Sequence, residues 1–169
     1  VWNIENELTG SCKTGVGLSE KGKEYFRRAQ RLGMLVDVSH LSERGFWDMM
    51  ELAEKPVVAS HSNARALCAH PRNLTDEQFR ALVQLGGTVG LNLVGSFLSD
   101  DGKASFDAFR RHYEHFLALD GDGHLALGLD LDGTDELPEG FTGVEHYEAL
   151  CDYLTGCGCP DNTMQNLFC

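Results

Sequence analysis

The sequence contains no apolar run of about 18 residues, the length that a membrane-spanning helix needs, so we expect no membrane span. Its first residues have neither a basic start nor an apolar core and so do not resemble a signal peptide. Glycine-rich phosphate loops of the GxGxxG or GxxxxGK(S/T) kind are missing. No repeat or low-complexity tract divides the chain, and we therefore interpret residues 1–169 as one partial domain.

Positive charge is also scarce. The chain has 14 Lys and Arg residues against 26 Asp and Glu residues, which gives a formal net charge of −12. Nucleic acids and anionic membrane surfaces both require clustered Lys and Arg, so we expect neither as a partner. An anionic substrate would need an arginine placed directly at its binding site to overcome this charge.

The six cysteines include no CxxC pair, and the lone C-x-C of Cys157 and Cys159 is a weak metal signal. The sequence favours reduced thiols in a cytosolic protein, so the expected location is the cytoplasm. The chain does not begin with Met, and a signal upstream of Val1 is therefore compatible with it.

Apolar runs and helical patterns alternate along the chain. The strand-like runs are mostly continuous apolar stretches, as expected for parallel strands that are buried on both faces. These runs cover residues 33–40, 56–61, 87–93 and 124–130. Helices are predicted from capping residues such as Ser19, Ser42 and Thr75 and from apolar positions at helical spacing. The predicted helices cover residues 19–31, 42–53, 75–83, 106–116, 144–155 and 161–168.

This alternation predicts an α/β fold with a parallel sheet. A chain of 169 residues with about four β/α units is short for a complete barrel of eight. We therefore expect the C-terminal half of a (β/α)8 TIM-type barrel of the metallo-dependent hydrolase kind. A half barrel would expose apolar strand edges, so we also expect self-association into a homo-oligomer.

Polar residues fall at or near the ends of the four strand-like runs: His40, His61, Asn92 and Asp130. In a (β/α)8 barrel, the carboxyl ends of the strands form the face on which active sites are built. Imidazoles and carboxylates are the ligand set of hydrolytic zinc, and a zinc-bound water can attack a carbonyl near neutral pH. Asn92 is a candidate for substrate binding or for support of the site.

Several segments resemble one known family. Together they resemble the membrane (renal-type) dipeptidases, peptidase family M19, in one register over nearly the whole chain. The segments are residues 32–42, 56–65, 69–74, 86–92 and 127–133.

The resemblance implies a (β/α)8 barrel with two zinc ions and hydrolysis of dipeptides by a metal hydroxide, including dipeptides with a C-terminal D-residue. His40 and His61 match the two histidines that bind one zinc. Arg72 matches the arginine that grips the substrate carboxylate, as its bidentate guanidinium suits. Asp130 matches the aspartate that holds the substrate amine and helps to transfer a proton to the leaving amine.

The sequence departs from the family pattern in two places. The family's His-x-Asp pair and bridging glutamate precede the matching segments, and nothing here replaces them. The family's substrate-binding histidine appears here as Trp2 or Asn3, which leaves the oxyanion contact and the substrate range open. With only two zinc ligands, the isolated chain is expected to be inactive.

Two other functions remain open from the sequence. One is a different metal-dependent amidohydrolase that cleaves a cyclic or acyl amide, in which Asp130 would be a metal ligand and general base. The other is a catalytically inactive fragment that acts as a binding module. An upstream His-x-Asp and a lone Glu would favour the dipeptidase.

The other histidines are predicted to be loop or surface residues: His70, His112, His115, His124 and His146.

Overall fold

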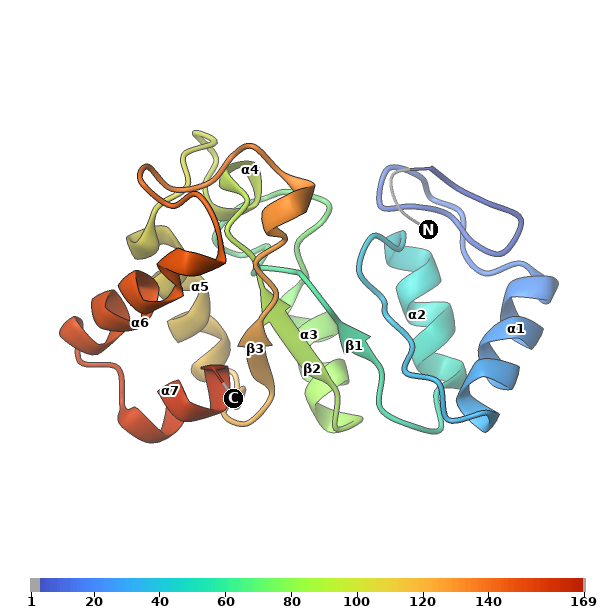
Figure 1. Cartoon of the computed structure of the whole chain (residues 1–169). Helices are drawn as coiled ribbons and strands as arrows, with labels where there is room; N and C mark the ends of the chain where they lie inside the picture. The colour runs from blue at the N-terminus through green and yellow to red at the C-terminus, as the bar shows by residue number, and fades with distance from the viewer. Residues whose placement is uncertain (1–3, 169) are drawn as a thin grey trace.

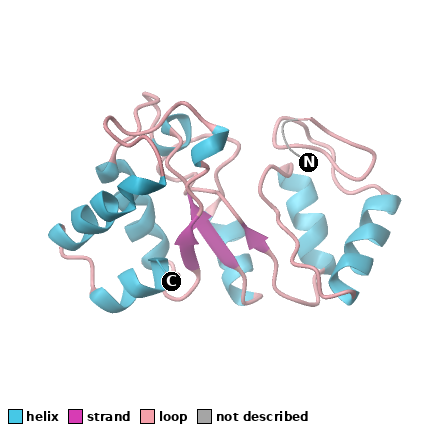
Figure 2. Cartoon of the chain, in the orientation of Figure 1, coloured by secondary structure: helices cyan, strands magenta, loops and turns pink. Residues whose placement is uncertain are grey.

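The computed structural model describes residues 4–168 and has an α/β fold (Figures 1 and 2). Its sheet contains three parallel strands in the order β1-β2-β3: β1 (Val58–Ala59), β2 (Thr88–Leu91) and β3 (Leu125–Leu127). The helices are α1 (Glu20–Arg31), α2 (Glu43–Leu52), α3 (Asp76–Gln84), α4 (Gly95–Leu98), α5 (Phe106–Leu117), α6 (Tyr147–Gly156) and α7 (Asp161–Phe168). Short 3-10 turns are η1 (Leu131–Gly133) and η2 (Val144–His146). No helix within residues 4–168 is long and apolar enough to cross a membrane.

Local side-chain chemistry starts three of these helices where the sequence predicts. The hydroxyls of Ser19 and Ser42 accept hydrogen bonds from backbone amides in the first turns of α1 and α2. Thr75 and Gln78 form a complete capping box at the start of α3. Each such cap contributes about 1 kcal/mol to helix stability because it satisfies an amide that has no partner within the helix.

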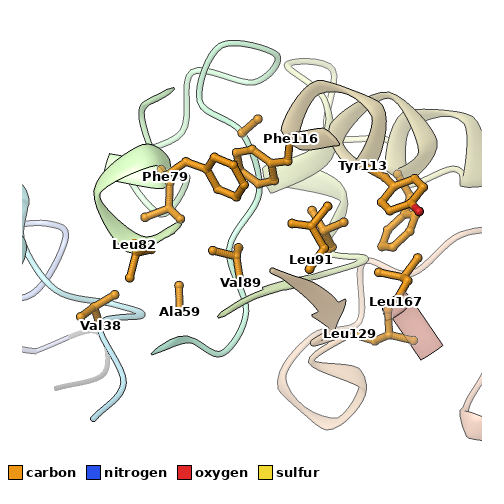
Figure 3. Close-up of a cluster of buried hydrophobic side chains, with 14 of the residues drawn as sticks. Val38, Ala59, Phe79, Leu82, Val89, Leu91, Tyr113, Phe116, Leu129 and Leu167 are labelled. Carbon is orange, nitrogen blue, oxygen red and sulfur yellow. The ribbon is translucent and has the colours of Figure 1, made fainter. Parts of the chain in front are cut away.

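The core lies between the sheet and the helices that cover it. Figure 3 shows Phe79 of α3 and Phe116 of α5 side by side above Val89 and Leu91 of β2. The two phenylalanine rings stack with centroids 4.0 Å apart, and both side chains are fully buried. Burial of an aromatic side chain of this size contributes roughly 1.5–3 kcal/mol, so this stack holds both helices on one face of the sheet.

The predicted first strand is wrong as a regular element. Residues 33–40 form only an isolated parallel bridge, in which Val38 N donates to Val58 O and Val58 N donates to Val36 O, at 2.7 and 2.9 Å. In the described part of the chain, no strand pairs with the other side of this segment. Leu35 is 68% exposed as a result. Within residues 4–168, this apolar segment is therefore paired on one side only.

His112 differs from its predicted surface position, because it is fully buried in α5. Its Nδ1 accepts from Ala64 N at 3.0 Å and its Nε2 donates to Leu98 O at 2.9 Å. Burial lowers the pKa of His112 to about 4, so the ring is neutral in the fold. His112 therefore joins α5 to the loop that follows β1 and to the end of α4.

Two glycines allow the strands to approach each other near the end of β1. A Cβ at Gly90 would lie 2.1 Å from the carbonyl oxygen of Ser60, and a Cβ at Gly128 would lie 1.9 Å from the same atom. Both contacts are shorter than any side chain tolerates, so larger residues would push the strands apart. This close approach positions Ser60 and the residue that follows it, His61.

Candidate active site

His40 and His61 face each other beyond the carboxyl end of β1. Their Nε2 atoms lie 2.8 Å apart, and their ring centroids lie 4.8 Å apart. Both rings line a groove of about 470 Å³ between α1 and the segment of residues 34–41. Two histidines that are 21 positions apart in the sequence are thus brought together by the parallel pairing of their segments.

Both imidazoles are held in the neutral form. Burial lowers the pKa of His40 to about 4, and the positive charges of Arg72 and His61 act in the same direction. Burial also lowers the pKa of His61, again with help from Arg72 and against the carboxylates of Asp130 and Asp37. A neutral imidazole has one nitrogen lone pair that can bind a metal ion. In the hydrogen bond between the two Nε2 atoms one nitrogen donates its proton and the other accepts it, so metal binding by both Nε2 atoms would displace that one proton.

A hydrogen-bonded chain that the sequence analysis missed supports His61. The carboxylate of Asp37 accepts the hydroxyl proton of Ser60 at 2.5 Å, and the Ser60 oxygen lies 2.8 Å from His61 Nδ1. Because Asp37 and Ser60 come from different segments, only the register of residues 36–38 against β1 brings them together. In the sequence alone, the only indication of this hydrogen-bonded chain was that Ser60 directly precedes His61.

Arg72 lies in the loop between β1 and α3 and is buried, with only 5% of its surface exposed. Its Nη2 donates to His61 O at 3.1 Å, and its guanidinium carbon lies 5.5 Å from the centre of the Phe97 ring. Within the described residues, no carboxylate oxygen lies within 4.0 Å of the guanidinium, and Nε has no partner. A buried cation without a protein counter-ion is suited to an incoming anion.

His70 and Phe97 pack around this arginine. The His70 ring stacks on Phe97 with centroids 4.5 Å apart, and its Nδ1 accepts from Arg72 N at 3.2 Å. Burial lowers the pKa of His70, and the nearby charge of Arg72 lowers it further. The loop position predicted for His70 agrees with the structure, and its contacts support Arg72.

Asp130 follows β3 and is half-buried. Its backbone is left-handed, with φ 60° and ψ 39°, and His40 has a φ of 71°. Only three non-glycine residues within residues 4–168 have positive φ, and two of them are site residues. Because the strands are parallel, Asp130 after β3 and His61 after β1 lie at the carboxyl edge of the same sheet, and the charge of Asp130 opposes the lowered pKa values of His61 and Arg72. Strained backbone often occurs at functional positions.

Of the two roles predicted for Asn92, substrate binding and support of the site, its contacts favour support. Its side chain is fully buried, and its Oδ1 accepts from Asn63 Nδ2 at 3.0 Å and from Val94 N at 3.1 Å. Asn92 N also donates to Asn63 Oδ1. These bonds join the loops that follow β1 and β2, so Asn92 supports the site without presenting a surface to a ligand.

The two imidazoles fit part of a zinc site. Zinc–nitrogen bonds of about 2.0–2.1 Å at a tetrahedral angle separate two nitrogens by roughly 3.3 Å, so a small opening of the 2.8 Å pair admits the ion. Within residues 4–168, no group of three or more His, Cys, Asp and Glu side chains could hold a metal. Trp2 and Asn3, predicted in place of a substrate-binding histidine, lie outside the described residues.

Comparison with known families decides the relationship. The family model described as membrane dipeptidase (peptidase family M19) matches residues 2–168. The chain belongs to the M19 dipeptidase family. A Klebsiella pneumoniae relative named "uncharacterized protein in pqqA 5'region" is 40% identical over 93% of this chain and 62% of its own length. An uncharacterized dipeptidase from Schizosaccharomyces pombe is 33% identical over 89% of this chain and 37% of its own length.

Solved structures of M19 members match the fold over almost the whole chain. A metallo peptidase from Rhodobacter sphaeroides, crystallised with a phosphinate mimic of the dipeptide L-Ala-D-Ala, has a TM-score of 0.92 at 35% identity. That match covers 99% of this chain and 51% of the other. An amidohydrolase from Pseudomonas aeruginosa, with a TM-score of 0.88 at 23% identity, shares the fold. This M19 chain therefore spans about half the length of the solved relatives.

Proposed function

We propose that the chain is the C-terminal half of a zinc-dependent dipeptidase. The observation that carries this proposal is the position of Arg72 against the histidine pair. A buried guanidinium that has no counter-ion among residues 4–168 donates to the backbone of His61, whose ring faces His40. An anion-binding group and two neutral metal-binding groups thus share one rim, as hydrolysis of a peptide with a free carboxylate requires.

Each residue has a separate role in the proposed reaction. His40 and His61 hold one zinc of a binuclear centre through their Nε2 atoms. Bound zinc supplies an activated water and polarises the scissile carbonyl. Arg72 binds the C-terminal carboxylate of the substrate and fixes its register. Asp130 binds the free amine and transfers a proton to the nitrogen that leaves.

The arginine also explains the choice of dipeptides. A carboxylate that must reach a buried guanidinium beside the metal ligands can have only one residue between it and the scissile bond. An endopeptidase substrate has no free carboxylate at this distance. Because the Rhodobacter sphaeroides relative is bound to a mimic of L-Ala-D-Ala, we extend the proposal to dipeptides with a C-terminal D-residue.

Beyond the α/β fold itself, we propose that the chain forms half of a (β/α)8 barrel. Three parallel strands and a bridged fourth segment stand in one row, and the carboxyl-end loops carry the site. Among the described residues no strand pairs with the other side of residues 34–38, and a further strand would fit there. The preceding half would then supply the remaining zinc ligands, because a catalytic zinc takes three protein ligands and a water.

The test uses the full-length protein. We expect zinc-dependent hydrolysis of dipeptides, with losses of at least about a hundredfold in kcat/KM and of bound zinc for His40→Ala and His61→Ala. His146→Ala is the control, because His146 lies in η2, far along the chain from both histidines. Zinc-dependent cleavage of cyclic or acyl amides without dipeptide cleavage would instead support the other amidohydrolase function. Absence of any zinc-dependent hydrolysis would support a binding module.

A further inference from the structure

Asp37 and Ser60 have no part in the reaction described above, yet Ser60 contacts the proposed metal-binding residue His61, and Asp37 contacts Ser60. Oδ1 of Asp37 accepts from the backbone amides of Ser39 and Ser60, at 2.9 and 3.0 Å. Oδ2 accepts from the Ser60 hydroxyl at 2.5 Å. The carboxylate therefore accepts three hydrogen bonds: Oδ1 accepts two from backbone amides, and Oδ2 accepts one from the Ser60 hydroxyl.

The directions of these bonds determine where the proton of His61 lies. A carboxylate can only accept, so the single hydroxyl proton of Ser60 points to Asp37. The Ser60 oxygen, 2.8 Å from His61 Nδ1, is then left as an acceptor. His61 Nδ1 must carry the proton, and the lone pair of the neutral ring lies on Nε2, the atom that faces His40.

We propose that Asp37 and Ser60 are positioning residues that fix the tautomer of His61 and thereby present its Nε2 lone pair to the zinc ion. The inference rests on the proposed zinc site. Carboxylates often orient metal-binding histidines directly, and here a serine hydroxyl connects the two groups. His40 has no such support, because its Nδ1 is buried without a partner among the described residues.

Asp37→Asn is the sharpest change, because it keeps the shape and reverses the bond direction. Two backbone amides donate to the Oδ1 position, so the amide oxygen of the asparagine must occupy it. The NH2 group then faces Ser60 and donates to its oxygen. The Ser60 proton turns to His61 Nδ1, which moves the ring proton to Nε2 and blocks the lone pair that zinc needs.

The first measurement determines the tautomer of His61 in the wild type and in Asp37→Asn. Long-range nitrogen–proton correlation spectra of the metal-free full-length protein, labelled with ¹⁵N-histidine, distinguish the protonated from the unprotonated ring nitrogen. We expect His61 to have the proton on Nδ1, and Asp37→Asn to move it to Nε2. A wild-type His61 with its proton on Nε2 would overturn the proposal.

The second measurement is zinc affinity, determined by competition with a chromophoric chelator. Ser60→Ala and Asp37→Asn are each expected to weaken zinc binding by about ten- to a hundredfold, whereas Ser60→Thr, which keeps the hydroxyl, stays within about threefold of wild type. Asp152→Asn removes an exposed carboxylate from α6 and controls for net charge. Equal affinities for Ser60→Ala and wild type would contradict the proposal.

A double-variant cycle separates the hydrogen-bonded chain from simple charge attraction. If Asp37 acts through Ser60, Asp37→Asn should change zinc affinity little in the Ser60→Ala background. Additive losses would mean that the carboxylate acts by its charge alone and would overturn the proposal. The His61→Ala variant tests the proposed zinc site separately. If it binds zinc as tightly as the wild type, the proposed zinc site is wrong. The nitrogen–proton spectra still show whether Asp37 and Ser60 fix the tautomer of His61.

Discussion

Replacement of Arg72 by lysine tests the substrate-binding arrangement most directly. The guanidinium lies 5.5 Å from the centre of the Phe97 ring and donates to His61 O through Nη2, which leaves its other donors for a carboxylate. A lysine ammonium keeps the charge but not the planar fork. Loss of one charge-assisted hydrogen bond costs roughly 1.5–3 kcal/mol, so kcat/KM for a dipeptide should fall about ten- to a hundredfold.

The assay compares a dipeptide with its C-terminal amide, which has no carboxylate. We expect the wild-type enzyme to cleave the amide poorly and Arg72→Lys to lose little further activity on it. Arg111→Lys, an exposed change in α5, is the matched control and should leave both substrates unaffected. Zinc content is measured in parallel, because Arg72 also holds the His61 backbone. An equal loss for dipeptide and amide would refute the carboxylate role and leave Arg72 as a structural residue.

Three further predictions follow from the described contacts. The isolated 169-residue chain, incubated with zinc, should bind the ion weakly and cleave no dipeptide, because it supplies two ligands; robust turnover would contradict this. Phe97→Leu should lower kcat/KM for dipeptides about three- to tenfold and spare the dipeptide amide, since it removes the ring beneath the Arg72 guanidinium. The pKa of His112 lies near 4 when folded and near 6.5 when unfolded, so the stability that neutral His112 contributes is fully present above pH 6.5 and is lost as the pH falls toward 4. Between pH 7 and 4.5 this loss should be roughly 2–3 kcal/mol in urea unfolding, and His112→Asn should remove that part of the pH dependence.

The sequence predicted those parts of the fold that depend on neighbouring residues. The starts of α1, α2 and α3 follow from hydroxyl and amide side chains that cap the first turn of each helix. The run at residues 33–40 was wrong as a strand because strand formation depends on partners elsewhere in the chain, and in the part of the chain that the structure describes only one side of this segment is paired. Local patterns carry no information about such partners.

The same distinction applies to the site. Strand-end position was enough to bring His40, His61 and Asp130 to the same side of the sheet. The support of His61 by Asp37 was not predictable, because it depends on the register between two segments. His112 could have been placed correctly, since it lies three residues after Phe109 and four before Phe116, on the buried face of α5. The charged residues Arg110 and Arg111, which directly precede His112, favoured the surface position that the sequence analysis gave it.

The left-handed backbone of His40 and Asp130 affects how the protein can be engineered. A left-handed conformation costs a non-glycine residue about 1 kcal/mol or more, so glycine at either position would relieve strain. At these two positions glycine therefore meets no backbone penalty, and a screen that selects only for resistance to heat has no conformational reason to reject His40→Gly or Asp130→Gly. These variants would lose the proposed zinc ligand and the proposed amine contact. Libraries for thermostability should keep both positions fixed, and gains elsewhere should be sought in residues that do not line the site.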